Sequence, residues 1–317
     1  MIKCYVRNES GITLIDTMSD LNEKTIENVI WVDMFTPSYD EIVFVENNFD
    51  IKFPTKQETE EIEISSRYWE ESDRIEINSF FLVSSAENPH NETVSFILTK
   101  KLMVSIRYAT LYTFDEFNRK FFAAPEQFTN GYDIFCHILD IRIDADADII
   151  EKLSRDITRL RKHVFTDYTN EDEEILERIS SLEDLNMQLR ENLNDKQRIL
   201  SAFLKSTKYN GELKHDVVVM LKDIKSLIDY TDFNFERLEY LQNIFLGLLS
   251  IEQNKVIKMF TIMNVIFLPP TLIASIYGMN FEFMPELKWK YGYLLSIGFM
   301  IASSILPLYV FKRKGWV

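Results

Sequence analysis

The sequence predicts an α/β domain followed by long α-helices and a C-terminal hairpin of two transmembrane helices. Three observations lead to this fold class. Short β-type runs alternate with helix-like segments as far as about residue 120. Apolar seams with helical spacing follow, and two long apolar segments without charged residues lie near the C-terminus. We therefore expect an α/β domain at 1–140, a long-helix region with a stalk at 141–253, and a membrane part at 254–317.

The N-terminal domain has five β-type runs with helix-like segments between them. The runs are 2–6, 29–32, 75–83, 93–98 and 102–107, and Ser38 is the expected N-cap of a helix over 39–48. A charged segment at 58–63 and 67–71 is expected to be solvated surface. The four histidines form no metalloprotease motif, and there is neither a phosphate-binding glycine loop nor a nucleophile elbow. We therefore expect no enzyme and no catalytic residue.

Composition excludes two further classes of site. The formal net charge of −15 argues against a general nucleic-acid binder, because such proteins need a basic surface. Cys4 and Cys136 are the only cysteines, too few and too far apart for a disulfide framework or a thiolate zinc site. Their scarcity fits a reducing compartment.

An acidic triplet resembles the opening of a calcium-binding loop. Its members are Asp144, Asp146 and Asp148. That loop needs glycine at its sixth position and glutamate at its twelfth, where this chain has Ile149 and Arg155. We expect a helix N-terminus here instead, because negative charge is favourable at that end of a helix.

Apolar seams predict three long helices in the middle of the chain. Two seams, over 153–164 and 175–204, are separated near 167–170 and indicate an antiparallel helical hairpin. Asn210-Gly211 breaks the pattern, so a third helix is expected to begin near Glu212. No helix breaker precedes Pro269-Pro270, and this helix is therefore expected to continue into the membrane.

Four carboxylates share one face of the third helix. They are Asp229, Asp232, Glu236 and Glu239. Like charges at helical spacing repel one another unless cations or basic side chains compensate. Two interpretations stay open, namely an ordinary solvated surface and a regulatory site for a divalent cation between subunits.

Two segments, 256–277 and 291–311, are long enough to cross the roughly 30 Å hydrocarbon core of a bilayer. Lysines 255 and 258 precede the first span, and a basic cluster, Lys312, Arg313 and Lys314, follows the second. By the positive-inside rule, both termini and the first two regions are cytoplasmic, and the loop 278–290 is external. We expect a multi-pass protein of the cytoplasmic membrane whose second span faces lipid.

A polar stripe follows one face of the first span and extends beyond it on both sides. Its members alternate at spacings of three and four residues: Asn254, Ile257, Thr261, Asn264, Leu268, Thr271, Ser275 and Gly278. One interpretation is helix packing, where small and hydroxylated residues are common. The other is a water-lined pore inside a ring of subunits, because lipid disfavours an asparagine. In such a pore, the two asparagines and Thr271 are stations for hydrated ions, and Ile257 and Leu268 are apolar gate rings, with Phe260 beside them.

The end of the stripe carries recognisable motifs. It reads Gly278-Met279-Asn280, and Met284-Pro285-Glu286-Leu287 follows in the loop. Both motifs resemble the CorA family of magnesium channels and transporters. Trp31-Val32-Asp33, Glu61-Ile62-Glu63 and Phe80-Phe81 resemble the soluble domain of that family less specifically. The resemblance implies a funnel-shaped homopentamer for passive Mg²⁺ influx, closed by intracellular Mg²⁺ bound between subunits.

The resemblance also implies roles along the pore. Gly278, Met279 and Asn280 would form the selectivity filter, where carbonyl and amide oxygens bind the hydration shell of Mg²⁺ without removing it. The outer mouth would be formed by Tyr277, Glu282 and Glu286. The basic cluster is either a collar around the inner mouth or a set of anchors for lipid headgroups.

The sequence leaves open which ion is transported and whether the protein conducts ions at all. Co²⁺ and Ni²⁺ are candidates for additional cargo. A zinc transporter of the same family is one alternative, and a non-conducting, membrane-anchored metal sensor is another. The sensor needs the hairpin as an anchor but has no need for the polar stripe.

Overall fold

The computed structural model describes residues 1–8, 11–17, 20–53, 67–71, 73–83, 89–166, 172–209, 211–280, 282 and 284–315. They form two compact units, Met1–Leu241 and Gln242–Val317. The expected motif Glu61-Ile62-Glu63 and the segment 58–63 lie outside the described residues. The second unit contains the two apolar helices near the C-terminus.

A seven-stranded sheet forms the base of the first unit, in the order β2-β1-β3-β7-β6-β5-β4. The strands are β1 (Ile2–Asn8), β2 (Gly11–Ile15), β3 (Val29–Phe35), β4 (Tyr68–Glu70), β5 (Arg74–Val83), β6 (His90–Thr99) and β7 (Met103–Arg107). Neighbouring strands pair antiparallel except β3 and β7, which are parallel. The five expected strands are confirmed. The short strands β2 and β4, at the two edges of the sheet, were not predicted.

Helices cover both faces of this sheet. Successive side chains of a strand point to opposite faces, so Val32 and Val104 pack with Val45 of α2 (Tyr39–Phe49) on one side. The other side packs against α4 (Tyr112–Ala123) and α5 (Gly131–Thr166). There the Trp31 ring meets the Phe117 ring edge-on, with centroids 5.2 Å apart. Two short elements, α1 (Glu23–Ile26) and the 3₁₀-helix η3 (Pro125–Gln127), complete this part.

The expected N-cap of α2 is confirmed. The Ser38 hydroxyl accepts a hydrogen bond from the Glu41 amide at 3.3 Å, and the Glu41 carboxylate accepts one from the Ser38 amide at 2.8 Å. This reciprocal capping box satisfies two amides that no carbonyl of the helix can reach.

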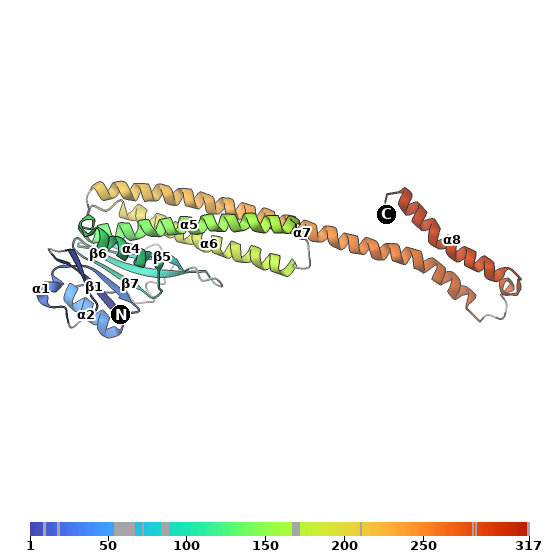
Figure 1. The fold of residues 1–317 in the computed structure, drawn as a ribbon, viewed down its shortest axis with the longest axis horizontal. Helices are drawn as coiled ribbons and strands as arrows, with labels where there is room; N and C mark the ends of the chain where they lie inside the picture. The colour runs from blue at the N-terminus through green and yellow to red at the C-terminus, as the bar shows by residue number, and fades with distance from the viewer. Residues whose placement is uncertain are drawn as a thin grey trace. The chain divides into compact units, whose positions relative to one another are not determined.

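Three long helices follow, and α5 and α6 (Asp172–Phe203) run side by side along the first part of α7 (Gly211–Tyr277) (Figure 1). The predicted hairpin and the start of the third helix are confirmed. The prediction that this helix continues as far as the proline pair is also confirmed, because α7 contains Pro269 and Pro270. The expected boundary at residue 140 lies within α5, and α7 contributes to both compact units.

The predicted helix N-terminus at the acidic triplet is wrong, because Asp144, Asp146 and Asp148 lie in the middle of α5. Asp146 is fully buried and pairs with Arg142 one turn away, whose Nε donates to its Oδ1 at 2.9 Å. Lys196 of α6 is also fully buried, with its Nζ 3.8 Å from Asp146 Oδ2. Two cations therefore compensate the charge that we had assigned to a helix end.

The Lys196 ammonium joins the helices to the sheet. It donates to the Phe80 carbonyl oxygen of β5 at 2.6 Å and to the Asn192 side chain. Burial lowers the pKa of Lys196 from 10.5 to about 8, although the charge of Asp146 opposes this effect. The prediction of a solvated surface is also wrong for Arg67, which is buried and lies 3.9 Å above the centre of the Phe80 ring. The Arg67 Nε lies 3.8 Å from Oδ1 of Asp195 on α6.

The motif Trp31-Val32-Asp33 has a structural role in the sheet. Asp33 is buried and accepts hydrogen bonds from Arg107 at 2.8 Å and from the Ser105 hydroxyl at 2.9 Å. The Trp31 indole N–H donates to the same Ser105 hydroxyl at 3.0 Å. These contacts tie the parallel pair β3 and β7 together through side chains as well as through the backbone.

Candidate ion pathway and carboxylate cluster

The second unit is a hairpin of the last part of α7 and α8 (Gly292–Arg313), joined through the 3₁₀-helix η4 (Pro285–Lys288). Both helices are long and apolar enough to span a membrane. The positions of α7 that α8 partly covers are Ile262, Val265, Ile266, Pro269, Pro270, Ile273 and Tyr277. On α8, the inward positions include Ser296, Met300, Ser304 and Phe311. The hairpin therefore packs along one face of α7.

The polar stripe lies on the face of α7 that α8 leaves open. All its members, Asn254, Ile257, Thr261, Asn264, Leu268, Thr271, Ser275 and Gly278, are exposed in the single chain, as is Phe260. The covered positions follow the stripe positions by one or two residues. At about 100° per residue, this places the two sets on roughly opposite sides of the helix. One hairpin therefore leaves the stripe exposed, although Thr261 also lines a cavity shared with α8.

Two hydroxyl groups of the stripe, those of Thr261 and Thr271, are oriented by their own helix. Thr261 donates to the Ile257 carbonyl oxygen at 2.8 Å, and Thr271 donates to the Phe267 carbonyl oxygen at 2.6 Å. Each hydroxyl has one proton to donate and two lone pairs that accept. Because the proton is used within the helix, the lone pairs can accept hydrogen bonds from outside it.

The expected filter residues lie where α7 ends. The Gly278 amide donates to the Ala274 carbonyl oxygen at 2.9 Å and the Met279 amide donates to the Ile276 carbonyl oxygen at 3.3 Å, so the last turn tightens. A Cβ atom on Gly278 would lie 3.1 Å from the Ala274 carbonyl oxygen. Asn280 follows this turn and is exposed. Gly278 therefore keeps the turn compact and directs the chain to Asn280.

The second half of the loop folds into a compact turn before α8. The Trp289 amide donates to the Glu286 carbonyl oxygen at 3.3 Å, and a Cβ atom on Gly292 would collide with that same oxygen. Glu282 and Glu286 are exposed, as the outer-mouth prediction requires, while Tyr277 is half-buried beside α8. The Trp289 and Tyr291 rings lie edge to face at the start of α8, with centroids 6.1 Å apart.

The basic residues of the two spans lie at the same end of the hairpin. Lys258, Thr261 and Ile262 of α7 line a cavity of about 530 Å³ together with Phe311 and Gly315, which flank the basic cluster. Lys312, Arg313 and Lys314 are all exposed. These four basic residues thus lie at the end of the hairpin opposite Asn280, whereas Lys288 and Lys290 lie in the loop at the Asn280 end.

The four carboxylates of the third helix lie in the first unit and have different surroundings. Asp232 forms an ion pair with Arg190 of α6 at 2.9 Å, and Asp229, Glu236 and Glu239 are exposed. Partial burial raises the pKa of Glu183 on α6, and the charges of Asp184 and Glu239 add to this effect. Within the described part of one chain, no cluster of three or more acidic, histidine or cysteine side chains is arranged to hold a metal ion.

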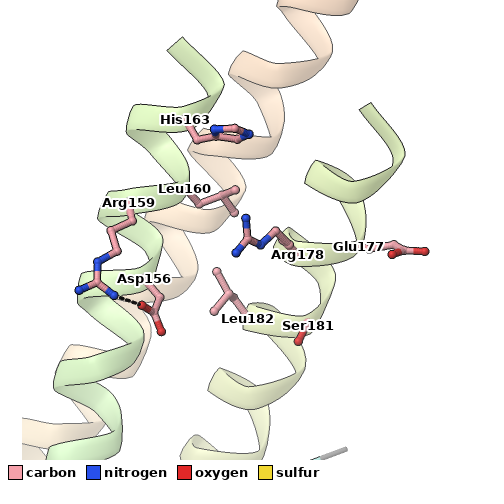
Figure 2. A pocket seen from close by; sticks show the side chains of 8 residues that line it. All are labelled: Asp156, Arg159, Leu160, His163, Glu177, Arg178, Ser181 and Leu182. Carbon is pink, nitrogen blue, oxygen red and sulfur yellow. Dashed lines mark hydrogen bonds and ion pairs between the residues drawn. The ribbon is translucent and has the colours of Figure 1, made fainter. Parts of the chain in front are cut away.

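A pocket that the sequence analysis did not predict lies between α5 and α6 (Figure 2). Its volume is about 580 Å³, and it is lined by Asp156, Arg159, Leu160, His163, Glu177, Arg178, Ser181 and Leu182. Arg159 pairs with Asp156 on its own helix at 3.0 Å, and Arg178 lies 3.8 Å from Glu174. The guanidinium groups of this pocket are thus already matched by carboxylates.

The fold and the hairpin together define a membrane protein with a large α/β and helical domain and an uncovered polar face on its first span. A family model described as CorA-like Mg²⁺ transporter protein matches residues 27–313. The chain belongs to this family. Family members are transporters rather than enzymes.

Individual relatives agree with this assignment. The chain is 43% identical to the magnesium transport protein CorA of Wolinella succinogenes, over all of both chains. It is 39% identical to the protein of the same name from Campylobacter jejuni subsp. jejuni, again over all of both chains. The complete structure of the CorA magnesium transporter from Methanocaldococcus jannaschii superposes with a TM-score of 0.81, covering 100% of this chain and 99% of that one. Its sequence identity is 19%, so this likeness concerns the fold.

Proposed function

We propose that the protein is a homopentameric channel that carries Mg²⁺ into the cell across the cytoplasmic membrane. The observation that carries the proposal is the polar stripe, which one hairpin leaves uncovered and which ends at Gly278-Met279-Asn280. Lipid disfavours such a face, whereas a ring of chains covers it and encloses water. The identity of 43% to a magnesium transport protein supports Mg²⁺ as the cargo.

Each part of the predicted pathway has a role in this proposal. Asn280 amides and Gly278 carbonyls form a ring of neutral oxygen acceptors that binds hydrated Mg²⁺, an ion that gives up its water reluctantly. Glu282 and Glu286 raise the cation concentration at the outer mouth. Further in, the polar positions hold the hydrated ion, and the apolar rings at Ile257 and Leu268 close the pore by excluding water.

Regulation and orientation complete the proposal. Intracellular Mg²⁺ bound between subunits near Asp229, Asp232, Glu236 and Glu239 closes the channel, because a divalent cation relieves the repulsion of facing carboxylates. The helix α7 contributes to both compact units and so connects these carboxylates to the gate. Both termini are cytoplasmic, and the basic cluster forms a collar at the inner mouth or binds lipid headgroups.

The test is Mg²⁺ uptake into proteoliposomes by the intact chain and by Asn280→Ala, with internal Mg²⁺ as a second variable. Asn47→Ala is the matched control, since Asn47 is an exposed asparagine of α2. Uptake that depends on Asn280 and falls as internal Mg²⁺ rises supports the proposal. Absence of uptake by correctly inserted, oligomeric protein refutes it and favours the sensor.

Competition decides the choice of ion. Zn²⁺, Co²⁺ and Ni²⁺ are added outside at graded concentrations, and their own uptake is measured by mass spectrometry of the vesicle contents. Preferential uptake of Zn²⁺ at equal concentration would replace the magnesium assignment by the zinc transporter. Slower entry of Co²⁺ and Ni²⁺ beside Mg²⁺ would identify them as additional cargo.

A further inference from the structure

The proline pair in the membrane part of α7 leaves two backbone carbonyls without their usual donors. A residue in a helix donates its amide N–H to the carbonyl four positions earlier, and proline has no N–H. Pro269 and Pro270 therefore free the carbonyl oxygens of Val265 and Ile266. In hydrocarbon, where water is absent, an unmatched carbonyl is costly, and a hydroxyl group of a neighbouring helix is one way to match it.

Ser304 of α8 supplies such a hydroxyl. Its Oγ donates to the Ile266 carbonyl oxygen at 3.1 Å and shares its proton with the Met300 carbonyl oxygen of its own helix at 3.2 Å. Ile266 and Ser304 are both half-buried between the two helices. The side chain of one span thus replaces the amide that Pro270 removes from the other.

This contact lies beside the predicted gate. Ile266 is flanked along the chain by the stripe residues Asn264 and Leu268, and Thr271 follows the proline pair directly. A helix that lacks two consecutive hydrogen bonds can bend at that point, and the bend decides where the next stripe residues point. We propose that Ser304 is a positioning residue for ion passage, which fixes the direction of α7 at Pro269-Pro270 so that the Leu268 ring closes fully.

The proposal rests on the proposed function, because it assigns Ser304 a role in closing that pore. A gate that works by excluding water requires its apolar side chains to meet closely. When Ser304 no longer matches the Ile266 carbonyl, α7 bends more freely at the prolines. The ring of Leu268 side chains then closes incompletely, and Mg²⁺ leaks through the regulated state.

The experiment compares Ser304→Ala with Ser303→Ala in proteoliposomes loaded with an inhibiting concentration of Mg²⁺. Ser303 is a matched control because its hydroxyl also donates to the Met300 carbonyl oxygen, at 2.8 Å, and belongs to the same helix. Both variants are also made in a Pro270→Ala background, where residue 270 regains an amide for Ile266. Ser304→Thr keeps a hydroxyl and serves as the conservative variant.

We expect Ser304→Ala to raise the residual uptake roughly threefold, as for the loss of one hydrogen bond between membrane helices. Ser303→Ala and Ser304→Thr should behave as the native chain does. In the Pro270→Ala background, Ser304→Ala should add no leak beyond that of Pro270→Ala alone. The inference is overturned if Ser304→Ala and Ser303→Ala raise the residual uptake equally, or if Ser304→Ala raises it just as much in the Pro270→Ala background. It is also overturned if Ser304→Ala does not raise the residual uptake at all.

A second measurement separates this inference from the proposed function. Thermal unfolding of the same variants in detergent should show Ser304→Ala lowering Tm by about 1–3 °C more than Ser303→Ala, and only when Pro270 is present. A native chain that takes up no Mg²⁺ refutes the channel and with it the gating role. A native chain that transports while the two serine variants unfold alike refutes the Ser304 contact alone.

Discussion

Replacing the buried Lys196 by methionine should remove a pH dependence from the stability of the first unit. In the folded chain burial lowers the pKa of Lys196 from 10.5 to about 8. Between these two pH values the unfolded chain binds the proton more strongly than the folded chain does, so stability from this group rises with pH. Below pH 8 Lys196 is protonated in both the folded and the unfolded chain. Burying its charge then lowers the stability of the folded chain by about 3 kcal/mol, at 1.4 kcal/mol per tenfold change in proton affinity.

The assay is thermal unfolding of the full chain in detergent at pH values from 7 to 10.5, with native protein and Lys196→Met measured together. The stability of the methionine variant relative to the native chain should fall by about 3 kcal/mol from the low to the high end of this range, which corresponds to roughly 6–12 °C in the difference of Tm. The variant also loses the hydrogen bond from Lys196 to the Phe80 carbonyl oxygen. This loss changes the Tm of the variant by a similar amount at every pH, so it does not alter the pH dependence of the difference. Lys205→Met, at an exposed position, is the control. Parallel curves for native protein and Lys196→Met would refute the reasoning.

Three further predictions concern the fold and the pathway. Gly131→Ala places a Cβ atom 2.5 Å from the Leu102 carbonyl oxygen and should destabilise the first unit by about 1–3 kcal/mol, so an unchanged urea midpoint contradicts this close approach. Thr271→Val keeps the shape of the side chain but removes a hydroxyl oxygen of the proposed pore lining. It should lower Mg²⁺ uptake about tenfold, whereas native rates would assign this threonine to helix packing. Neutralising Glu282 and Glu286 by glutamine should slow uptake at low ionic strength and have little effect at 1 M salt, because the ions then screen exposed carboxylates. An effect independent of salt would exclude electrostatic attraction as their role.

Periodicity in the sequence was enough to predict the main elements of the fold. The five β-type runs stand out as short apolar runs, and β3 and β7 are buried on both faces. The helical hairpin and the continuous α7 follow from apolar residues at helical spacing. The edge strands β2 and β4 were missed, since short edge strands bury little and carry a weak pattern. The burial of Asp146 was missed for a different reason. Its charge is matched by Lys196, a residue 50 positions further along the chain, and no local sequence pattern predicts that contact.

Some features of the candidate site depend on one helix alone and could be predicted, whereas others depend on contacts with a second helix and could not. The stripe from Asn254 to Gly278 is a property of one helix, so its spacing could be read directly, and the structure adds that α8 leaves it open. The carboxylates of α7 could not be sorted by sequence, because the ion pair of Asp232 with Arg190 and the nearness of Glu239 to Glu183 depend on α6. The match between Ser304 and the Ile266 carbonyl likewise requires both spans.

The orientation of the stripe hydroxyls bears on which of the two original interpretations of the stripe is the better one. If the stripe served to pack helices together, its hydroxyl protons would be most useful as donors to a neighbouring chain. Thr261 and Thr271 instead donate to carbonyl oxygens of their own helix and turn only acceptor lone pairs outward. A hydrated cation presents the hydrogen atoms of its water outward, and these need acceptors. Hydroxyls oriented in this way offer acceptors to hydrated Mg²⁺, as the pore that we propose requires, and Thr271→Val tests that role.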